Sequence, residues 1–76
     1  MALIKKFTEK RMERVSLHKP IDATYTPFEF DGRKLFQLDS YGSTERQIPG
    51  KKSQSIQLDE DSARTLHRLL AQHFNL

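Results

Sequence analysis

The sequence of 76 residues predicts an α+β fold, with an antiparallel four-stranded β-sheet followed by one C-terminal α-helix packed on one face. Two observations predict this class. Residues 23–58 contain segments in which apolar and polar residues alternate, with Gly, Pro and Asp turn residues between them. Residues 60–74 instead place their apolar side chains in one stripe at helical spacing, at Ala63, Leu66, Leu69, Leu70 and Phe74.

The first 19 residues are predicted to form a basic N-terminal arm. They hold six basic and two acidic residues, a net charge of +4. Their apolar residues do not share one helical stripe, and the segment RMERVSL is compatible with an edge strand. The first strand of the sheet is therefore expected within this arm, toward Leu17. Residues 20–76 are expected to form a single domain with the element order ββ(β)α.

A β-hairpin is predicted around Asp31-Gly32, because this dipeptide tolerates the positive φ angles of a two-residue type I′ turn. This turn makes Glu29 face Lys34, a pair of opposite charges that favours the register. Pro27 cannot donate a ladder hydrogen bond, so its strand is expected at an edge of the sheet or at a bulge.

Side-chain alternation gives this hairpin two faces. The apolar face, expected on the core, holds Tyr25, Pro27, Phe36 and Leu38. The other face, here called the mixed face, combines aromatic, polar and charged residues: Phe28, Phe30, Arg33, Leu35, Gln37, Asp39 and Tyr41.

The third segment of the domain is a polar connection followed by a strand and the helix. Pro49-Gly50 predicts a type II turn just before Lys51 and Lys52. The strand SQSIQL then adds Ser53, Ser55 and Gln57 to the mixed face. Asp59 is a good N-cap, so the helix is expected from about Glu60 to Phe74.

Composition excludes several classes of protein. The chain has no cysteine, which removes disulfides and thiolate chemistry, and no apolar run approaches the roughly 20 residues of a membrane span. His67 and His73 are six residues apart on the helix and cannot hold one ion together, and His18 is distant from both. No catalytic signature is present. We therefore expect a soluble, cytoplasmic, non-enzymatic protein with no catalytic residue, metal or cofactor, and a chain this short is expected to self-associate.

The strongest functional pattern combines cations with exposed rings. Residues 33–58 hold five basic and two acidic residues, a net charge of +3. Single-stranded nucleic acids bind through cations that contact phosphates and aromatic rings that stack on bases. The candidate nucleic-acid-binding residues are Phe30, Arg33, Tyr41, Arg46, Lys51 and Lys52. Two other interpretations stay open: the charge serves solubility alone, or the rings are covered by the arm or by a second subunit.

Residues 28–70 resemble the core of the transcriptional positive cofactor four family of single-stranded-DNA-binding proteins. The similar features are the hairpin turn Phe30-x-Gly32-Arg33, a polar loop that closes on Gly50-Lys51-Lys52, an Ile-x-Leu strand and an acid-capped helix. The resemblance implies a dimer paired through helices and strand edges, with nucleic acid on the concave face of the sheet. It also implies that Phe30, Arg33 and Lys52 supply an aromatic and two cationic contacts.

The chain departs from that family's pattern in three places. It has Asp39 and Gly42 where a basic residue and a tryptophan are usual, and Asp31 where a lysine is usual. These differences weaken the expected single-strand affinity or redirect the surface to a protein.

The sequence therefore predicts a homodimeric protein that binds single-stranded nucleic acid, DNA in preference to RNA, with a role connected to transcription. The alternative is a protein–protein interaction module that uses the same face, for instance for a component of the transcription machinery.

Overall fold

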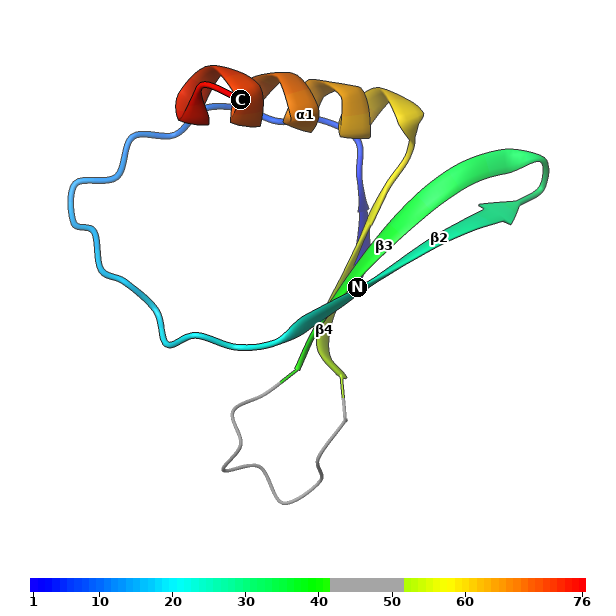
Figure 1. The fold of residues 1–76 in the computed structure, drawn as a ribbon, viewed down its shortest axis with the longest axis horizontal. Helices are drawn as coiled ribbons and strands as arrows, with labels where there is room; N and C mark the ends of the chain where they lie inside the picture. The colour runs from blue at the N-terminus through cyan, green and yellow to red at the C-terminus, as the bar shows by residue number, and fades with distance from the viewer. Residues whose placement is uncertain (42–51) are drawn as a thin grey trace.

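The computed structural model describes residues 1–41 and 52–76, and only the backbone of Lys52 and Ser53. It contains a four-stranded sheet and one C-terminal helix, so the α+β class is confirmed (Figure 1). The strands lie in the order β1-β4-β3-β2. The elements are β1 (Ala2–Ile4), β2 (Ala23–Phe30), β3 (Arg33–Tyr41), β4 (Lys52–Leu58) and α1 (Glu60–Phe74).

The sheet is mixed, so the prediction of a purely antiparallel sheet is wrong. β1 pairs with β4 in parallel, with Ala2 opposite Ile56 and Ile4 opposite Leu58. The other two pairings, β2 with β3 and β3 with β4, are antiparallel. The direction of β1 follows from a contact between residues 54 positions apart in the chain, such as Ala2 and Ile56, about which the local residue pattern carries no information.

The first strand also lies elsewhere in the arm than the sequence indicated. It spans Ala2–Ile4, and residues 5–22 contain no strand. The segment toward Leu17 instead belongs to an extended arc that joins β1 to β2 on the far edge of the sheet (Figure 1).

The hairpin between β2 and β3 is confirmed in turn and register. Asp31 and Gly32 have φ angles of 52° and 74°, as a type I′ turn requires. Glu29 lies opposite Lys34 in the β2–β3 register. β2 is an edge strand, which is where a proline such as Pro27 is tolerated.

Helix α1 is also confirmed, with both ends capped. The Asp59 carboxylate accepts a hydrogen bond from the Ser62 backbone N–H at 2.9 Å, and the Asp59 N–H donates to Ser62 Oγ at 3.0 Å. This reciprocal pair satisfies two backbone donors at the helix start. Asn75 ends the helix in the left-handed conformation, at φ 58°.

The apolar face is mostly uncovered, which differs from the expectation that it forms the core. Among the described residues, Leu58 is the one buried large hydrophobic side chain. Helix α1 contacts β3 and β4, yet Tyr25 on this face remains 68% exposed and Leu38 and Ile56 each 37%. One chain therefore supplies too little apolar material to cover its own sheet.

Within the described ranges, no helix has the length and apolarity needed to cross a membrane.

Candidate nucleic-acid interface

The strand registers bring the predicted mixed face together across three strands. Residues that lie opposite one another in a ladder share a face of the sheet. Phe30 lies opposite Arg33 between β2 and β3, while Gln37 lies opposite Gln57 and Asp39 opposite Ser55 between β3 and β4. The division into faces derived from the sequence is therefore correct for these residues.

The hairpin end of this face carries an exposed ring and a cation. Phe30 is 65% exposed, and the Arg33 side chain beside it is 58% exposed. Arg33 Nη2 lies 4.0 Å from Asp59 Oδ2, which is beyond hydrogen-bonding distance. Arg33 thus forms a long ion pair with Asp59 without a direct hydrogen bond.

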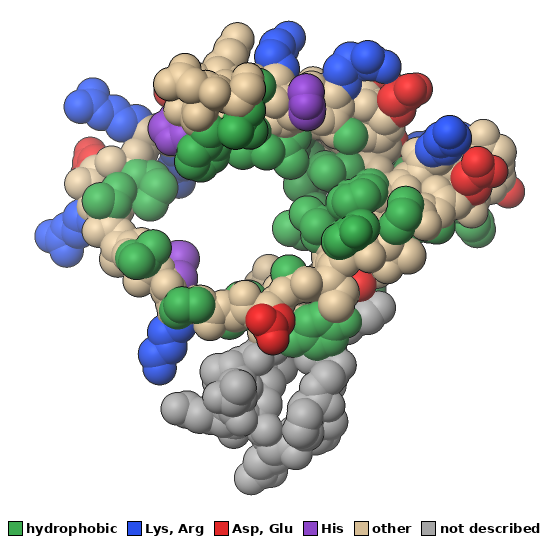
Figure 2. Space-filling view, in the orientation of Figure 1, with side chains coloured by type: hydrophobic (Ala, Val, Ile, Leu, Met, Phe, Trp, Pro, Cys, Tyr) green, Lys and Arg blue, Asp and Glu red, His purple; other side chains and the backbone are tan. Residues whose placement is uncertain are grey.

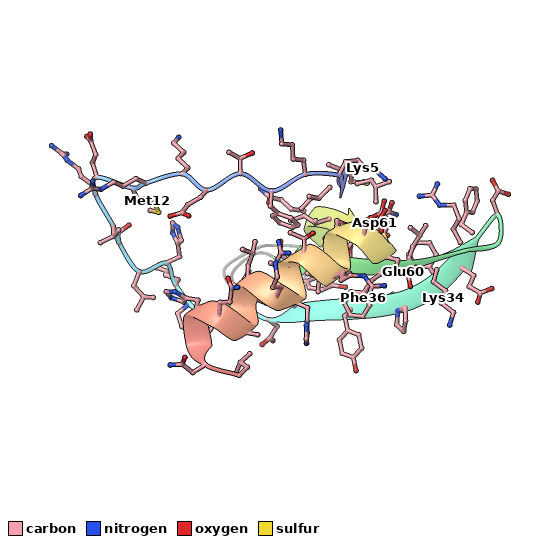
Figure 3. All side chains as sticks on the ribbon, turned by 90° about the horizontal axis from the view of Figure 1, so that it is seen from above. Lys5, Met12, Lys34, Phe36, Glu60 and Asp61 are labelled. Carbon is pink, nitrogen blue, oxygen red and sulfur yellow. The ribbon has the colours of Figure 1, made fainter. Side chains whose placement is uncertain are left out.

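The Asp59 carboxylate is held in place by a second cation, Lys5, which the sequence did not connect to it. Lys5 Nζ donates a hydrogen bond to the Oδ2 atom that faces Arg33 (the labels in Figure 3 mark Lys5 close to the first turn of α1). The hydrogen bond from Lys5, followed by that from the Ser62 backbone N–H, holds the pKa of Asp59 well below its usual range. Lys5 and Arg33 therefore lie beside the same ionised carboxylate.

A polar ladder crosses the middle of the mixed face. Gln57 Nε2 donates to Gln37 Oε1 at 2.9 Å, and Gln37 Nε2 donates to Asp39 Oδ1 at 2.9 Å. Ser55 Oγ donates to the same Asp39 oxygen, and Asp39 is only 2% exposed. Because a carboxylate only accepts, Asp39 fixes the orientation of both carboxamides. The sequence placed these residues on one face but contained no sign of their network.

A hollow of about 240 Å³ adjoins this ladder. It is lined by Gln37, Ser55 and Gln57 on one side and by Met1, Ala2 and Leu3 on the other. Side-chain amides and a hydroxyl supply hydrogen-bonding groups there, and Leu3 supplies apolar surface. The hollow exists because β1 lies beside β4, so the sequence alone could not locate it.

Tyr41 lies at the opposite end of the face from Phe30 and Arg33. It is half-buried, and its hydroxyl is 3.0 Å from Thr24 Oγ1, within hydrogen-bonding distance. Arg33 and Tyr41 are the first and last residues of β3, so they are separated by roughly 25 Å at about 3.3 Å per residue. The predicted residues therefore line a long track and do not converge on one point.

Of the other predicted cations, only Lys52 lies in the described part of the chain, and only by its backbone. The backbone of Lys52 pairs with Tyr41 across a register shift between Ser40 and Tyr41, which brings it to the far end of the track. Arg46 and Lys51 lie outside the described residues. Over the described ranges, no group of three or more His, Cys, Asp or Glu side chains is arranged to hold a metal ion.

No family model, curated protein or solved structure matches this chain. The class that the structure defines is a small α+β protein with a mixed four-stranded sheet and one C-terminal helix. The resemblance to the positive cofactor four family stays a prediction from the sequence.

Proposed function

We propose that this chain is a small non-enzymatic protein that binds single-stranded nucleic acid along the mixed face of its sheet and acts as a homodimer. The observation that carries the proposal is the exposed Phe30 ring beside the Arg33 guanidinium at the hairpin end of that face. A phenyl ring left in solvent offers a π surface, and base stacking on such a ring contributes about 1–3 kcal/mol per base.

The rest of the face suits a strand more than a single nucleotide. The track between Arg33 and Tyr41 is roughly 25 Å long, which accommodates about seven nucleotides at the 3.4 Å spacing of stacked bases. Between its ends, the hollow beside Gln37 and Gln57 offers polar groups suited to the edge of an unpaired base. Hydrogen-bonding groups and rings of this kind bind bases with little preference for sequence.

The carboxylates of Asp39 and Asp59 lie on or beside this face and would repel a phosphate if they were free to meet it. Asp39 is 2% exposed and accepts hydrogen bonds from Gln37 and Ser55, so a bound phosphate would not reach it. Asp59 is bound to Lys5 and faces Arg33. The net charge of the chain is +3, which attracts a polyanion, and this attraction weakens as salt is added. The preference for DNA and the connection to transcription follow from the sequence resemblance alone.

The proposal is tested by fluorescence anisotropy with a labelled single-stranded oligonucleotide at several salt concentrations. Log affinity should fall linearly with log salt, by roughly 0.7 per contacted phosphate. Phe30→Leu should weaken binding roughly 5- to 150-fold because it removes one stacking platform, whereas Phe30→Tyr keeps a ring and should bind as the wild type does.

A matched pair of charge variants separates specific contact from general attraction. Arg33 lies on the mixed face, and its neighbour Lys34 lies on the opposite face of the same strand. Arg33→Ala should therefore weaken oligonucleotide binding more than Lys34→Ala, although both remove one positive charge. Equal effects of the two variants would contradict the assignment of the mixed face. Absence of oligonucleotide binding by the wild type would instead favour the protein-interaction alternative.

A further inference from the structure

An opening passes through the described part of the molecule and is bordered by apolar side chains. Residues 5–22 form an arc from β1 to β2, and the arc, α1 and the sheet together surround the opening (Figure 1). Figure 2 shows hydrophobic side chains from all three around it, while lysine and arginine side chains of the arc lie on the outer rim. The large apolar residues that these segments expose include Met12, Val15, Leu17, Ile21, Tyr25, Leu38, Ile56, Leu69, Leu70 and Phe74.

The chain exposes more surface than a compact protein of its mass, and the difference is a measure of the area that a partner would bury. The chain exposes 7491 Å². A compact protein of its mass exposes about 4,800 Å², so the chain has an excess of roughly 2,700 Å². The radius of gyration agrees, at 14.7 Å, where a compact chain of this length has about 11 Å. Obligate homodimers bury about 1,000–2,500 Å² on each subunit, which is close to this excess.

The chemistry of the opening selects the kind of occupant. A nucleic-acid strand needs inward-facing cations, whereas here the cations of the arc face outward and the border is apolar. The occupant is therefore an apolar protein element. The arc cannot be held by its own contacts, because the arc residues Met12, Val15 and Leu17 are 64–101% exposed and ordering each residue costs about 1–2 kcal/mol.

A second copy of this chain provides a suitable element in its own α1. The exposure of the apolar stripe increases along this helix, from half-buried Leu66 to 41% at Leu70 and 62% at Phe74. The C-terminal half of α1 lies away from the sheet, at the border of the opening (Figure 1). The C-terminal half of α1 therefore borders the opening of its own chain and also exposes apolar side chains that could fill the opening of a second copy. The same two surfaces then meet reciprocally, as a two-fold interface requires.

We propose that the arc of each protomer closes around the C-terminal half of α1 of a second copy, which gives an interlocked homodimer. Both ends of the arc are attached to the sheet, through β1 at one edge and β2 at the other. The β1 attachment consists of three residue pairs and the Lys5–Asp59 ion pair, so it is the end that opens when the subunits assemble or exchange.

Sedimentation equilibrium of the full chain, without nucleic acid, tests the proposal. The wild type should have a mass of about 18 kDa, twice the 8.9 kDa of one chain. Val15→Asp should weaken dimerisation roughly tenfold or more, because Val15 is 77% exposed in one chain and would be buried only by the partner. Ser16→Asp adds the same charge at the adjacent exposed position and should dimerise as the wild type does.

Three results would overturn the interlocked dimer. The first is a wild type that stays monomeric, and the second is equal dimerisation of the Val15→Asp and Ser16→Asp variants. The third is a dimer that Leu70→Glu disrupts and Val15→Asp does not, since that pattern means that helices pair without the arc. Because the assay contains no oligonucleotide, its outcome does not depend on the proposed nucleic-acid binding.

Discussion

Replacing Asp39 by Asn should destabilise the protein substantially, although the two side chains have nearly the same shape. Asp39 is 2% exposed and accepts hydrogen bonds from the Gln37 carboxamide and the Ser55 hydroxyl. Both of these hydrogen bonds reach Oδ1, and Gln37 Nε2 also donates to Oδ2 at 3.2 Å. An asparagine keeps only one accepting oxygen, so its NH₂ group would take the place of Oδ2 and meet the Gln37 donor. A hydrogen bond to a charged group contributes about 1.5–3 kcal/mol, and an unsatisfied buried donor costs a further 1–3 kcal/mol.

We therefore expect Asp39→Asn to lower the free energy of unfolding by about 2.5–6 kcal/mol. That is a large fraction of the 4–11 kcal/mol typical of about 76 residues. Urea unfolding followed by circular dichroism measures it as a lower midpoint with an unchanged slope. Asp22→Asn is the matched control, because Asp22 is exposed and the same chemical change should have almost no effect there. A midpoint shift no larger than that of the control would refute the role of the ladder.

Two further perturbations test other parts of the structure. Because the folded chain lowers the pKa of Asp59, unfolding takes up a proton as the pH falls below about 4, and stability should fall with pH in that range. Thermal melts of the Asp59→Asn variant should show a weaker acid dependence than the wild type, and an identical dependence would contradict the pairing with Lys5. Gly32→Ala should lower the free energy of unfolding by about 1–2 kcal/mol, because Gly32 has φ +74°, which residues with a Cβ rarely adopt. A Cβ there would meet nothing within 4 Å, so the cost comes from the backbone conformation alone. Urea unfolding measures that cost, and an unchanged midpoint would show that the turn relaxes.

Elements that depend on neighbouring residues were predictable from the sequence. Asp31-Gly32 specified the hairpin and its register, because few dipeptides adopt two consecutive positive φ angles. Asp59 and the apolar stripe specified α1 from Glu60 to Phe74. The mixed face followed from alternation, which is sufficient by itself to assign Phe30 and Arg33 to one surface.

Features that join distant parts of the chain needed the tertiary structure. Lys5 and Asp59 are 54 residues apart, and no local pattern relates them. The same holds for the parallel pairing of β1 with β4, which creates the hollow beside Gln57. Sequence periodicity identified the apolar face but could not show that α1 leaves Tyr25 and Leu38 uncovered. Alternation and caps report which residues point the same way, whereas burial depends on which elements meet across space, and a chain of this size leaves part of that to a partner.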